Sequence, residues 1–369
     1  MVFVVLISFP LFLYIVLIVR YYFGWMKIPN IPKQHYFPEV SIVISLRNEE
    51  NHVEDLLESL KSQIYPVEKL EFIFVNDHST DNTLSLLEKR KISNSCVLNM
   101  PEGQSGKKYA IAMAVSVAKG DIILASDADC TFSPYWAQKM AYNFKHNDVL
   151  LVSGPVTFKK QGGLFQHFQA LEFTSLIASG VGAIGINNPI FCNGANMAYR
   201  KEVFLEVNNF KEDNIVSGDD VFLLHNVKAK YPNSVAFAKH PDTIVQTEST
   251  KDFREFINQR KRWVAKSSTY RDLASIYTSY LVFFTNLLFL SLFVMLFFDV
   301  FFIQFFVLFY FLKFLVDLFL LYPALKFFNR EDLIKWVFSF ELVYSFYIIL
   351  IVFLSFNKKF EWKGRMHNK

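Results

Sequence analysis

The sequence has few of the residue patterns that build structural metal sites or disulfide frameworks. Its 369 residues include three cysteines and eight histidines. Cys96, Cys130 and Cys192 show no C-x-x-C spacing and the histidines form no ligand pattern, so neither a zinc site nor a disulfide framework is predicted. The chain also lacks internal repeats and low-complexity segments. Its net charge of +4 is mild and does not indicate a nucleic-acid partner.

Apolar residues are abundant and gather at the two ends of the chain. They make up 52% of the sequence, and phenylalanine alone contributes 42 residues. Residues 2–19 carry no charge and are followed by Arg20, Lys27 and Lys33. Because a membrane span needs about 20 apolar residues, this stretch is just long enough. A cleaved signal peptide is the competing interpretation, but no basic region precedes the run and no small-residue cleavage site follows it. An uncleaved anchor with its linker is therefore predicted for residues 1–36.

The C-terminal segment, residues 276–369, is predicted to be a membrane domain of about three spans with a basic tail. Asp299 marks the first break between spans, and Pro323 marks the second. The predicted spans cover residues 277–298, 300–322 and 334–355.

Two charged residues lie inside the second of these spans. Lys313 and Asp317 are four residues apart, so they can face each other on one side of a helix. A charge inside a membrane is a functional hypothesis by default. A self-neutralising pair that faces the other helices is an equally good interpretation, and the sequence leaves both open.

Between residues 37 and 250, short apolar runs alternate with amphipathic helical segments, which is typical of βαβ units and a mostly parallel sheet. A helix is expected after the first strand, with Asn51 as its N-cap and Glu54 three residues further on, the spacing of a capping box. The predicted strands cover residues 40–45, 70–77 and 120–129.

Acidic residues end two of these strands. Asp77 ends the second strand, and Asp127 and Asp129 end the third. A D-x-D pair is a weak motif by itself. In open α/β sheets, however, ligands bind beyond the carboxyl ends of the strands. A pair that shares this edge with another strand-terminal aspartate predicts a ligand site there.

Two further clusters follow. Gly218, Asp219 and Asp220 precede a helical segment, and QRKRW (259–263) lies in an amphipathic stretch just before the first C-terminal span. Alone, the acidic pair would be a solvated helix start. Alone, the basic run would be a set of side chains that snorkel beside a membrane.

Taken together and in this order, the motifs resemble those of the family-2 glycosyltransferases. These are inverting enzymes with a GT-A fold, and they include membrane-embedded polysaccharide synthases and lipid glycosyltransferases. The FQALEF stretch (168–173) is also similar to membrane members. The motifs that carry the resemblance are SLRNEE (45–50), VNDHSTDNT (75–83), GKKYAI (106–111), SDAD (126–129), NGANMAYRKEVF (193–204), GDD (218–220) and QRKRW (259–263).

The resemblance implies a GT-A domain, which is Rossmann-like with a mostly parallel sheet, flanked by transmembrane helices. The catalytic domain would cover residues 37–250, and an interfacial helix with QRKRW would cover residues 251–275. This arrangement places the catalytic domain between the anchor and the membrane domain.

The resemblance also implies a nucleotide-sugar site with a divalent cation, Mg²⁺ or Mn²⁺, because these cations prefer oxygen ligands and substrate phosphates. Asp129 is expected to bind the metal, and Asp127 is expected to lie toward the ribose and sugar. Asp77 would accept a hydrogen bond from the base. The remaining donor residues are Glu49 in the base pocket, Arg47 where many relatives have an aromatic residue, and Lys107 beside the diphosphate.

On the acceptor side, the resemblance implies that Asp220 is the general base, since inversion needs a base opposite the leaving nucleotide. Asp219 stands where relatives often have Glu. Gln259, Arg262 and Trp263 match the Q-x-x-R-W motif of processive synthases. Asn193 and Gly194 are also assigned to the acceptor or diphosphate side.

The expected activity is transfer of a hexosyl or N-acetylhexosaminyl group, with inversion, from a nucleotide-diphosphate sugar to a hydroxyl of a lipid or lipid-linked acceptor. A UDP-sugar is the family's commonest donor. The alternative is a processive β-polysaccharide synthase that translocates its product. A third hypothesis is a catalytically inactive donor-binding scaffold. The expected location is the bacterial inner membrane, in contact with membrane lipids, with the catalytic domain in the cytoplasm.

The charge of the tail conflicts with three complete spans. Basic residues near membrane spans favour the cytoplasmic side, and three spans would place the tail outside. One predicted span is therefore re-entrant or interfacial, or a break between spans is misplaced. The basic tail residues are Lys358, Lys359, Lys363, Arg365 and Lys369.

Overall fold

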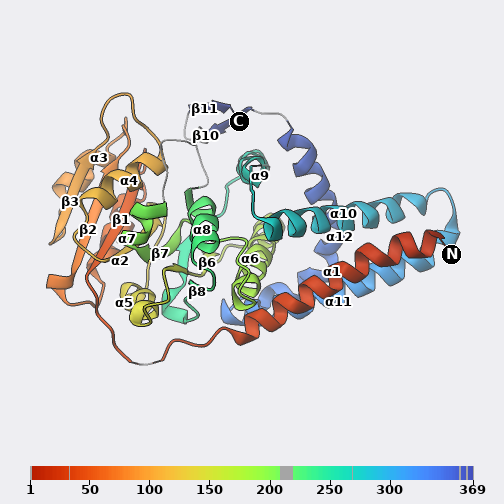
Figure 1. Cartoon of the computed structure of the whole chain (residues 1–369). Helices are drawn as coiled ribbons and strands as arrows, with labels where there is room; N and C mark the ends of the chain where they lie inside the picture. Colours follow the sequence, from red (N-terminus) through yellow and green to blue (C-terminus); the bar gives the residue numbers. More distant parts are fainter. Residues whose placement is uncertain are drawn as a thin grey trace.

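The computed structural model describes residues 2–32, 34–207, 219–267, 269–356, 359–362 and 365–368. It contains a sheet domain and a bundle of long helices, with helix α6 (Leu164–Gly185) between them (Figure 1). The N-terminal helix α1 (Val2–Lys27) belongs to the bundle, so the chain enters the sheet domain from the bundle and later returns to it.

The main sheet has seven strands in the order β3-β2-β1-β4-β7-β5-β8. Most neighbours are parallel, and β7 is antiparallel to both β4 and β5. The predicted α/β class with a mostly parallel sheet is therefore confirmed. The strands are β1 (Val40–Leu46), β2 (Leu70–Asn76), β3 (Ser95–Asn99), β4 (Ile122–Asp127), β5 (Leu151–Ser153), β7 (Asn196–Arg200) and β8 (Val235–Phe237).

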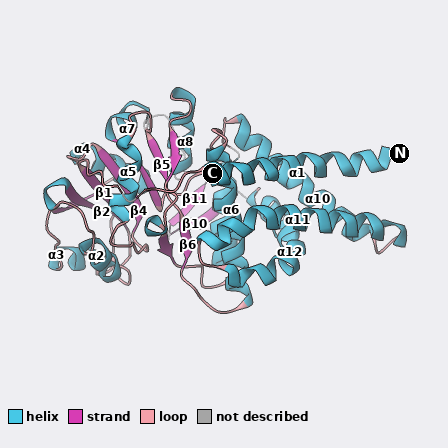
Figure 2. Ribbon diagram, turned by 90° about the horizontal axis from the view of Figure 1, so that it is seen from below, coloured by secondary structure: helices cyan, strands magenta, loops and turns pink. Residues whose placement is uncertain are grey.

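Helices cover both faces of this sheet (Figure 2). Strand β1 is buried on both sides because Ile42 and Ile44 point into one core and Val43 points into the other. Its sequence VSIVISL is accordingly a nearly continuous apolar run, as expected for a central parallel strand. The helices of this domain are α2 (Val53–Lys61), α3 (Thr83–Lys89), α4 (Lys107–Val117), α5 (Trp136–Tyr142), α7 (Lys201–Val207) and α8 (Asp219–Lys230).

The strand register brings the carboxyl ends of the predicted strands together. Ser45 near the end of β1 lies opposite Val75 of β2 on one side and Asp127 of β4 on the other. The ends of β2 and β4 therefore flank the end of β1. The prediction that Asp77 shares an edge of the sheet with Asp127 and Asp129 is confirmed.

The predicted cap of helix α2 is wrong. The helix begins at Val53 with His52 at the N-cap position, and no side chain caps it. The amides of His52 and Val53 instead donate to the carbonyl oxygen of Glu49 at 2.8 and 3.1 Å. Since this backbone turn already satisfies the first amides, the side chain of Asn51 is not needed, and Glu54 pairs with Arg90.

Within the described residues, four helices are long and apolar enough to cross a membrane: α1, α10 (Leu273–Met295), α11 (Ile303–Phe327) and α12 (Ile334–Ser355). The predicted end of the second C-terminal span at residue 322 is wrong, because α11 continues through Pro323 to Phe327. Bundle neighbours at this end of α11 hold its last turn, since Ala324 and Leu325 are fully buried.

Helix α12 runs across the bundle (Figure 1) and contacts several other helices along its length. Glu341 pairs with Lys313 of α11, Ser345 donates to the side-chain oxygen of Asn286 in α10 at 2.7 Å, and Tyr347 packs against helix α9 (Phe253–Ser267). The tail strand β10 (Lys359–Trp362) then pairs with β11 (Arg365–Asn368) and lies against α9 (Figure 1). Tail residues 359–362 therefore lie beside α9. Three of the basic tail residues, Lys358, Lys363 and Lys369, are outside the described residues.

Helices α1 and α6 are in backbone contact. A Cβ atom at Gly24 would collide with the carbonyl oxygen of Gly182, and one at Gly182 would collide with the carbonyl oxygen of Tyr21. Small residues of this kind let membrane helices approach closely. One apolar core continues from Tyr14 and Trp25 of α1 to the strands of the sheet, so α1 is part of the packing of the sheet domain.

We expect Gly182→Leu to destabilise the protein by about 1–3 kcal/mol, the usual cost of adding volume to a packed site. The side chain would have to push α1 away from α6. Thermal unfolding in detergent measures the effect. Gly162→Leu is the matched control, because no atom lies within 4 Å of a Cβ there. Equal melting temperatures for the two variants would contradict the close packing.

Candidate active site

Arg47 and Asp77 join the loops that follow β1 and β2. The guanidinium of Arg47 donates to the carbonyl oxygens of Asp77 and His78 at 2.8 and 3.3 Å. The Asp77 carboxylate is buried and accepts a hydrogen bond of 3.0 Å from the amide of Gly106. Gly106 has φ of +106°, a conformation that favours glycine. These contacts connect the part of the predicted donor site that would hold the nucleotide base to the start of α4.

Glu49 lies in the same loop region and is buried. Its carboxylate contacts Nδ1 of His52 at 2.8 Å, and its amide donates to the hydroxyl of Thr83 at 2.8 Å. The hydrogen bond with Glu49 raises the pKa of His52, although burial opposes the shift. Glu49 therefore fixes the loop between β1 and α2 beside the end of β2.

A polar network connects the predicted donor and acceptor residues. Nζ of Lys107, at the start of α4, lies 2.5 Å from Oδ1 of Asp127 and 3.2 Å from the carbonyl oxygen of Gly194. The amide of Gly194 donates to Oδ2 of Asp220 at 3.0 Å. A Cβ atom at Gly194 would lie 3.2 Å from both Nζ of Lys107 and Oδ2 of Asp220, so a larger residue would crowd the junction.

Asp220 lies in the first turn of α8. Its Oδ1 accepts a hydrogen bond of 2.8 Å from the amide of Val221. The two amides, from Gly194 and Val221, fix the orientation of the carboxylate. Gly218 and the side chain of Asp219 are outside the described residues.

Tyr270, which follows α9, packs against α8 beside this carboxylate. Its ring lies 5.9 Å from that of Phe222 and 5.1 Å from that of His225. Burial raises the pKa of Tyr270, and the nearby charge of Asp220 raises it further. The hydroxyl therefore stays protonated next to Asp220 and can act there as a hydrogen-bond donor.

Asp129 follows β4 and contacts the second, smaller sheet, which consists of β6 (Val156–Phe158) and β9 (Val245–Thr247). Its Oδ2 accepts a hydrogen bond of 3.0 Å from the hydroxyl of Thr247. Burial raises the pKa of the adjacent Cys130 thiol well above its ordinary value, with the charge of Asp129 adding to the shift. Cys130 is therefore a neutral thiol, and the groups at this position that could bind a cation are carboxylates.

The residues present fit a Mg²⁺ or Mn²⁺ ion of the kind that is completed by substrate. Among the described residues, no group of three His, Cys, Asp or Glu side chains forms a ready-made metal cage. Magnesium sites in nucleotide enzymes usually use one or two carboxylates together with substrate phosphates. Asp127 and Asp129 supply hard oxygen atoms of this type at the sheet edge.

The QRKRW motif lies on α9, as predicted, but its most buried residue is one that the sequence prediction did not select. Arg260 is 1% exposed and binds Glu172 of α6, with its Nε 3.0 Å from Oε1. Its guanidinium lies 4.1 Å from the ring centre of Trp263, and the side chain of Gln259 accepts a further hydrogen bond from it. Burial alone would lower the pKa of Arg260, but the charge of Glu172 outweighs this effect and raises it.

Glu172 also joins α9 to the membrane helices. Its Oε1 accepts a hydrogen bond of 3.0 Å from the hydroxyl of Tyr347 in α12. Trp263 packs against the neighbouring Phe173 with ring centres 6.1 Å apart. Arg262, the other predicted residue of the motif, lies on the same helix. The ion pair between Glu172 of α6 and Arg260 of α9 thus positions the motif. The sequence signal for this pair was the FQALEF stretch, which contains Glu172.

A family model, Glycosyl transferase family 2, matches residues 41–207. The poly-beta-1,6-N-acetyl-D-glucosamine synthase of Staphylococcus aureus (strain MSSA476) is 30% identical over 142 residues, which are 37% of this chain and 33% of that protein. A Bacillus subtilis (strain 168) protein described as "Probable glycosyltransferase YdaM" is 30% identical over 151 residues, 39% of this chain and 33% of that protein. The matches span about a third of the length of these curated relatives.

Among solved structures, the mannosyltransferase PcManGT from Pyrobaculum calidifontis, in complex with GDP-Man and Mn²⁺, superposes with a TM-score of 0.55 at 21% identity. The match covers 71% of this chain and 70% of that chain. This likeness shows the fold. The two comparisons agree: residues 41–207 match the Glycosyl transferase family 2 model, and the sheet domain has a GT-A-like fold.

Proposed function

We propose that this protein is an inverting membrane glycosyltransferase. It would move a sugar from a nucleotide-diphosphate sugar to a hydroxyl of a lipid or lipid-linked acceptor at the cytoplasmic face of the membrane. The observation that carries the proposal is the network in which Lys107 links Asp127 to Gly194, and Gly194 links to Asp220. This network connects the edge of the sheet that would bind the sugar donor to Asp220, the carboxylate assigned as the general base.

On the donor side, Asp77 would bind the base, and Asp127 would face the ribose and sugar. Lys107 is a point charge that suits diphosphate oxygens, and it already lies between Asp127 and the acceptor side. Asp129 would hold the divalent cation. When bound, such an ion neutralises the charge on the leaving diphosphate without a proton transfer.

On the acceptor side, Asp220 would take the proton of the attacking hydroxyl. General bases act from within hydrogen-bond reach of the proton. The two amides that hold Asp220 fix its position on α8 before the acceptor arrives. Trp263 and Arg262 on α9 would contact the acceptor and the diphosphate.

The membrane bundle supports an acceptor presented at the bilayer. Helix α9 packs against α12 and the tail strand β10, and Arg260 joins it to Glu172 of α6. We place the catalytic domain and the tail on the cytoplasmic side, in agreement with the basic residues of both. In this placement α12 lies across the bundle and is not a complete span. This would resolve the conflict between the basic tail and three complete C-terminal spans.

The second candidate is a processive polysaccharide synthase. The similarity to the Staphylococcus aureus synthase favours it, and so does the QRKRW motif. The product distinguishes the two candidates, since mass spectrometry would show either one added sugar or a ladder of lengths. The inactive scaffold predicts no turnover of any donor.

We expect purified protein in detergent to hydrolyse one nucleotide sugar slowly, in the presence of Mg²⁺ or Mn²⁺. Asp129→Ala should lower this metal-dependent rate at least about 100-fold, because ion stabilisation of the leaving group is worth several kcal/mol. The donor panel should include uridine and guanosine diphosphate sugars. Asp148→Ala, an exposed position, is the control. No turnover and no metal-dependent nucleotide binding with any donor would exclude the proposed site.

A further inference from the structure

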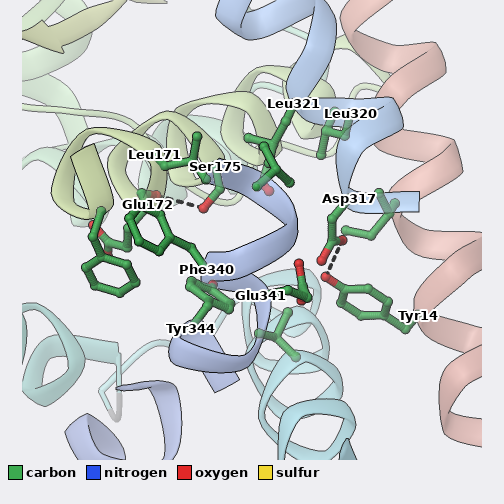
Figure 3. A pocket seen from close by; sticks show the side chains of 15 residues that line it. Tyr14, Leu171, Glu172, Ser175, Asp317, Leu320, Leu321, Phe340, Glu341 and Tyr344 are labelled. Atoms are coloured by element: carbon green, nitrogen blue, oxygen red, sulfur yellow. Dashed lines mark hydrogen bonds between the residues drawn. The ribbon is translucent and has the colours of Figure 1, made fainter. Parts of the chain in front are cut away.

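A cavity lies among the membrane helices (Figure 3). None of the carboxylates at the sheet edge lines it. It has about 80 Å³ of room for the centres of water-sized molecules, several times the roughly 10–15 Å³ that one water requires. Helices α1, α6, α10, α11 and α12 all contribute to its wall. A site at the junction of five helices is a typical place for a ligand.

The carboxylates in the wall are already bound by other side chains. Asp317 accepts a hydrogen bond of 2.6 Å from the hydroxyl of Tyr14 and lies 2.8 Å from Nζ of Lys313. Glu341 pairs with the same ammonium group. Whether both carboxyl groups are ionised or only one, this cluster has no net positive charge. A phosphate group would therefore meet no attraction here.

The third acidic residue of the wall, Glu172, is neutralised from outside the cavity. Arg260 of α9 binds it on the side of the catalytic domain, at 2.5 Å between Nη2 and Oε2. The pair adds no net charge to the site. It does place the cavity directly behind the QRKRW helix, since Glu172 borders both.

Two hydroxyl groups of the wall have no hydrogen-bond partner within the described part of the chain. They belong to Ser179 of α6 and Tyr344 of α12, both of which are only partly buried and line the cavity. Phe168 and Phe340 add aromatic surface, with their ring centres 5.6 Å apart. Unpaired hydroxyls beside aromatic rings suit a ligand that offers hydroxyl groups on an apolar body.

The depth of the cavity suits a lipid. Asp317 lies ten residues before the end of α11, which is about 15 Å along the helix. The apolar part of the wall consists of Ile18, Leu171, Val282, Leu320, Leu321 and Val337. A ligand here would have its polar end held below the surface of the bilayer.

We propose that this cavity binds the uncharged, hydroxyl-bearing head group of a membrane lipid, such as a glycerol or sugar head on acyl chains. The inference goes beyond the proposed function, because a head group held here is not at the sheet edge, where Asp220 would act. A neutral lipid is selected, and a polyprenyl phosphate is rejected, because the wall supplies hydroxyls and paired carboxylates but no spare positive charge.

The test uses the full chain in nanodiscs, with dioleoylglycerol, a monoglucosyl dioleoylglycerol and undecaprenyl phosphate as probes. Binding is followed by native mass spectrometry and by ligand-dependent thermal shift. We expect the two neutral lipids to bind and the phosphate to bind at least tenfold more weakly. Equal or tighter binding of undecaprenyl phosphate would overturn the proposal.

Two variants locate the binding. Ser179→Leu fills the cavity, and Tyr344→Phe removes a hydroxyl with little change in volume, so each should weaken neutral-lipid binding at least tenfold. Ser291→Leu and Tyr322→Phe are the matched controls on α10 and α11, outside the wall. If both cavity variants fold, as judged by lipid-free melting, and bind like the wild type, the site is wrong. Donor hydrolysis by the wild type is measured separately, so failure of the proposed function is distinguished from failure of the cavity assignment.

Discussion

Asp220→Asn is expected to lower the rate of sugar transfer by about 10²–10⁴-fold, the usual contribution of a positioned general base. The amide keeps the shape of the side chain, but its single oxygen can accept from only one of the two backbone amides, of Gly194 and Val221, that hold Asp220 at 3.0 and 2.8 Å. It cannot take a proton from the acceptor hydroxyl. Binding of the nucleotide should therefore persist while transfer is lost.

The measurement pairs a transfer assay with nucleotide binding by calorimetry. Asp55→Asn in helix α2 is the matched control, because Asp55 also lies in the first turn of a helix and is exposed. If Asp220→Asn transfers sugar at the rate of this control, another group must be the base. Loss of nucleotide binding in the variant would instead assign Asp220 to the donor side.

Arg260→Met should lower the free energy of unfolding by about 3–5 kcal/mol, because it leaves the carboxylate of Glu172 buried without its partner. Arg260 and Glu172 are 1% and 5% exposed, and the carboxylate is also bound by Tyr347. The double variant Arg260→Met with Glu172→Gln removes both charges. It should regain much of the lost stability.

Denaturant unfolding in a single detergent measures this series. Arg254→Met is the control, an exposed arginine on the same helix. A double variant as unstable as Arg260→Met would show that the contact of the guanidinium with Trp263 matters more than its ion pair. We expect transfer activity to fall in both variants, since the stacked guanidinium 4.1 Å from Trp263 is absent from each.

The sequence predicted the part of the site that depends on strand order. Asp77, Asp127 and Asp129 follow apolar runs that were predicted as strands of a mostly parallel sheet, and the register then places them at one edge. The predicted face-to-face pairing of Lys313 and Asp317 is also confirmed. These predictions succeeded because each needs only local periodicity and one topological rule.

The contacts that complete the site are long-range and have no local pattern. Asp129 accepts from Thr247, which is 118 residues away, and Glu172 binds Tyr347, 175 residues away. Spacing along the chain cannot reveal such pairs. The cap at Asn51 failed for the opposite reason, since a backbone turn at Glu49 satisfied the same amides without a side chain.

The close contact of α1 with α6 has a consequence for how substrates meet. Because Gly24 and Gly182 leave no space between these helices, the catalytic domain cannot tilt toward the bilayer without separating the anchor from its own core. Under the proposed function, Asp220 would then stay at a fixed height above the membrane. The length of the acceptor's head group, rather than a movement of the domain, would decide which hydroxyl reaches the sugar.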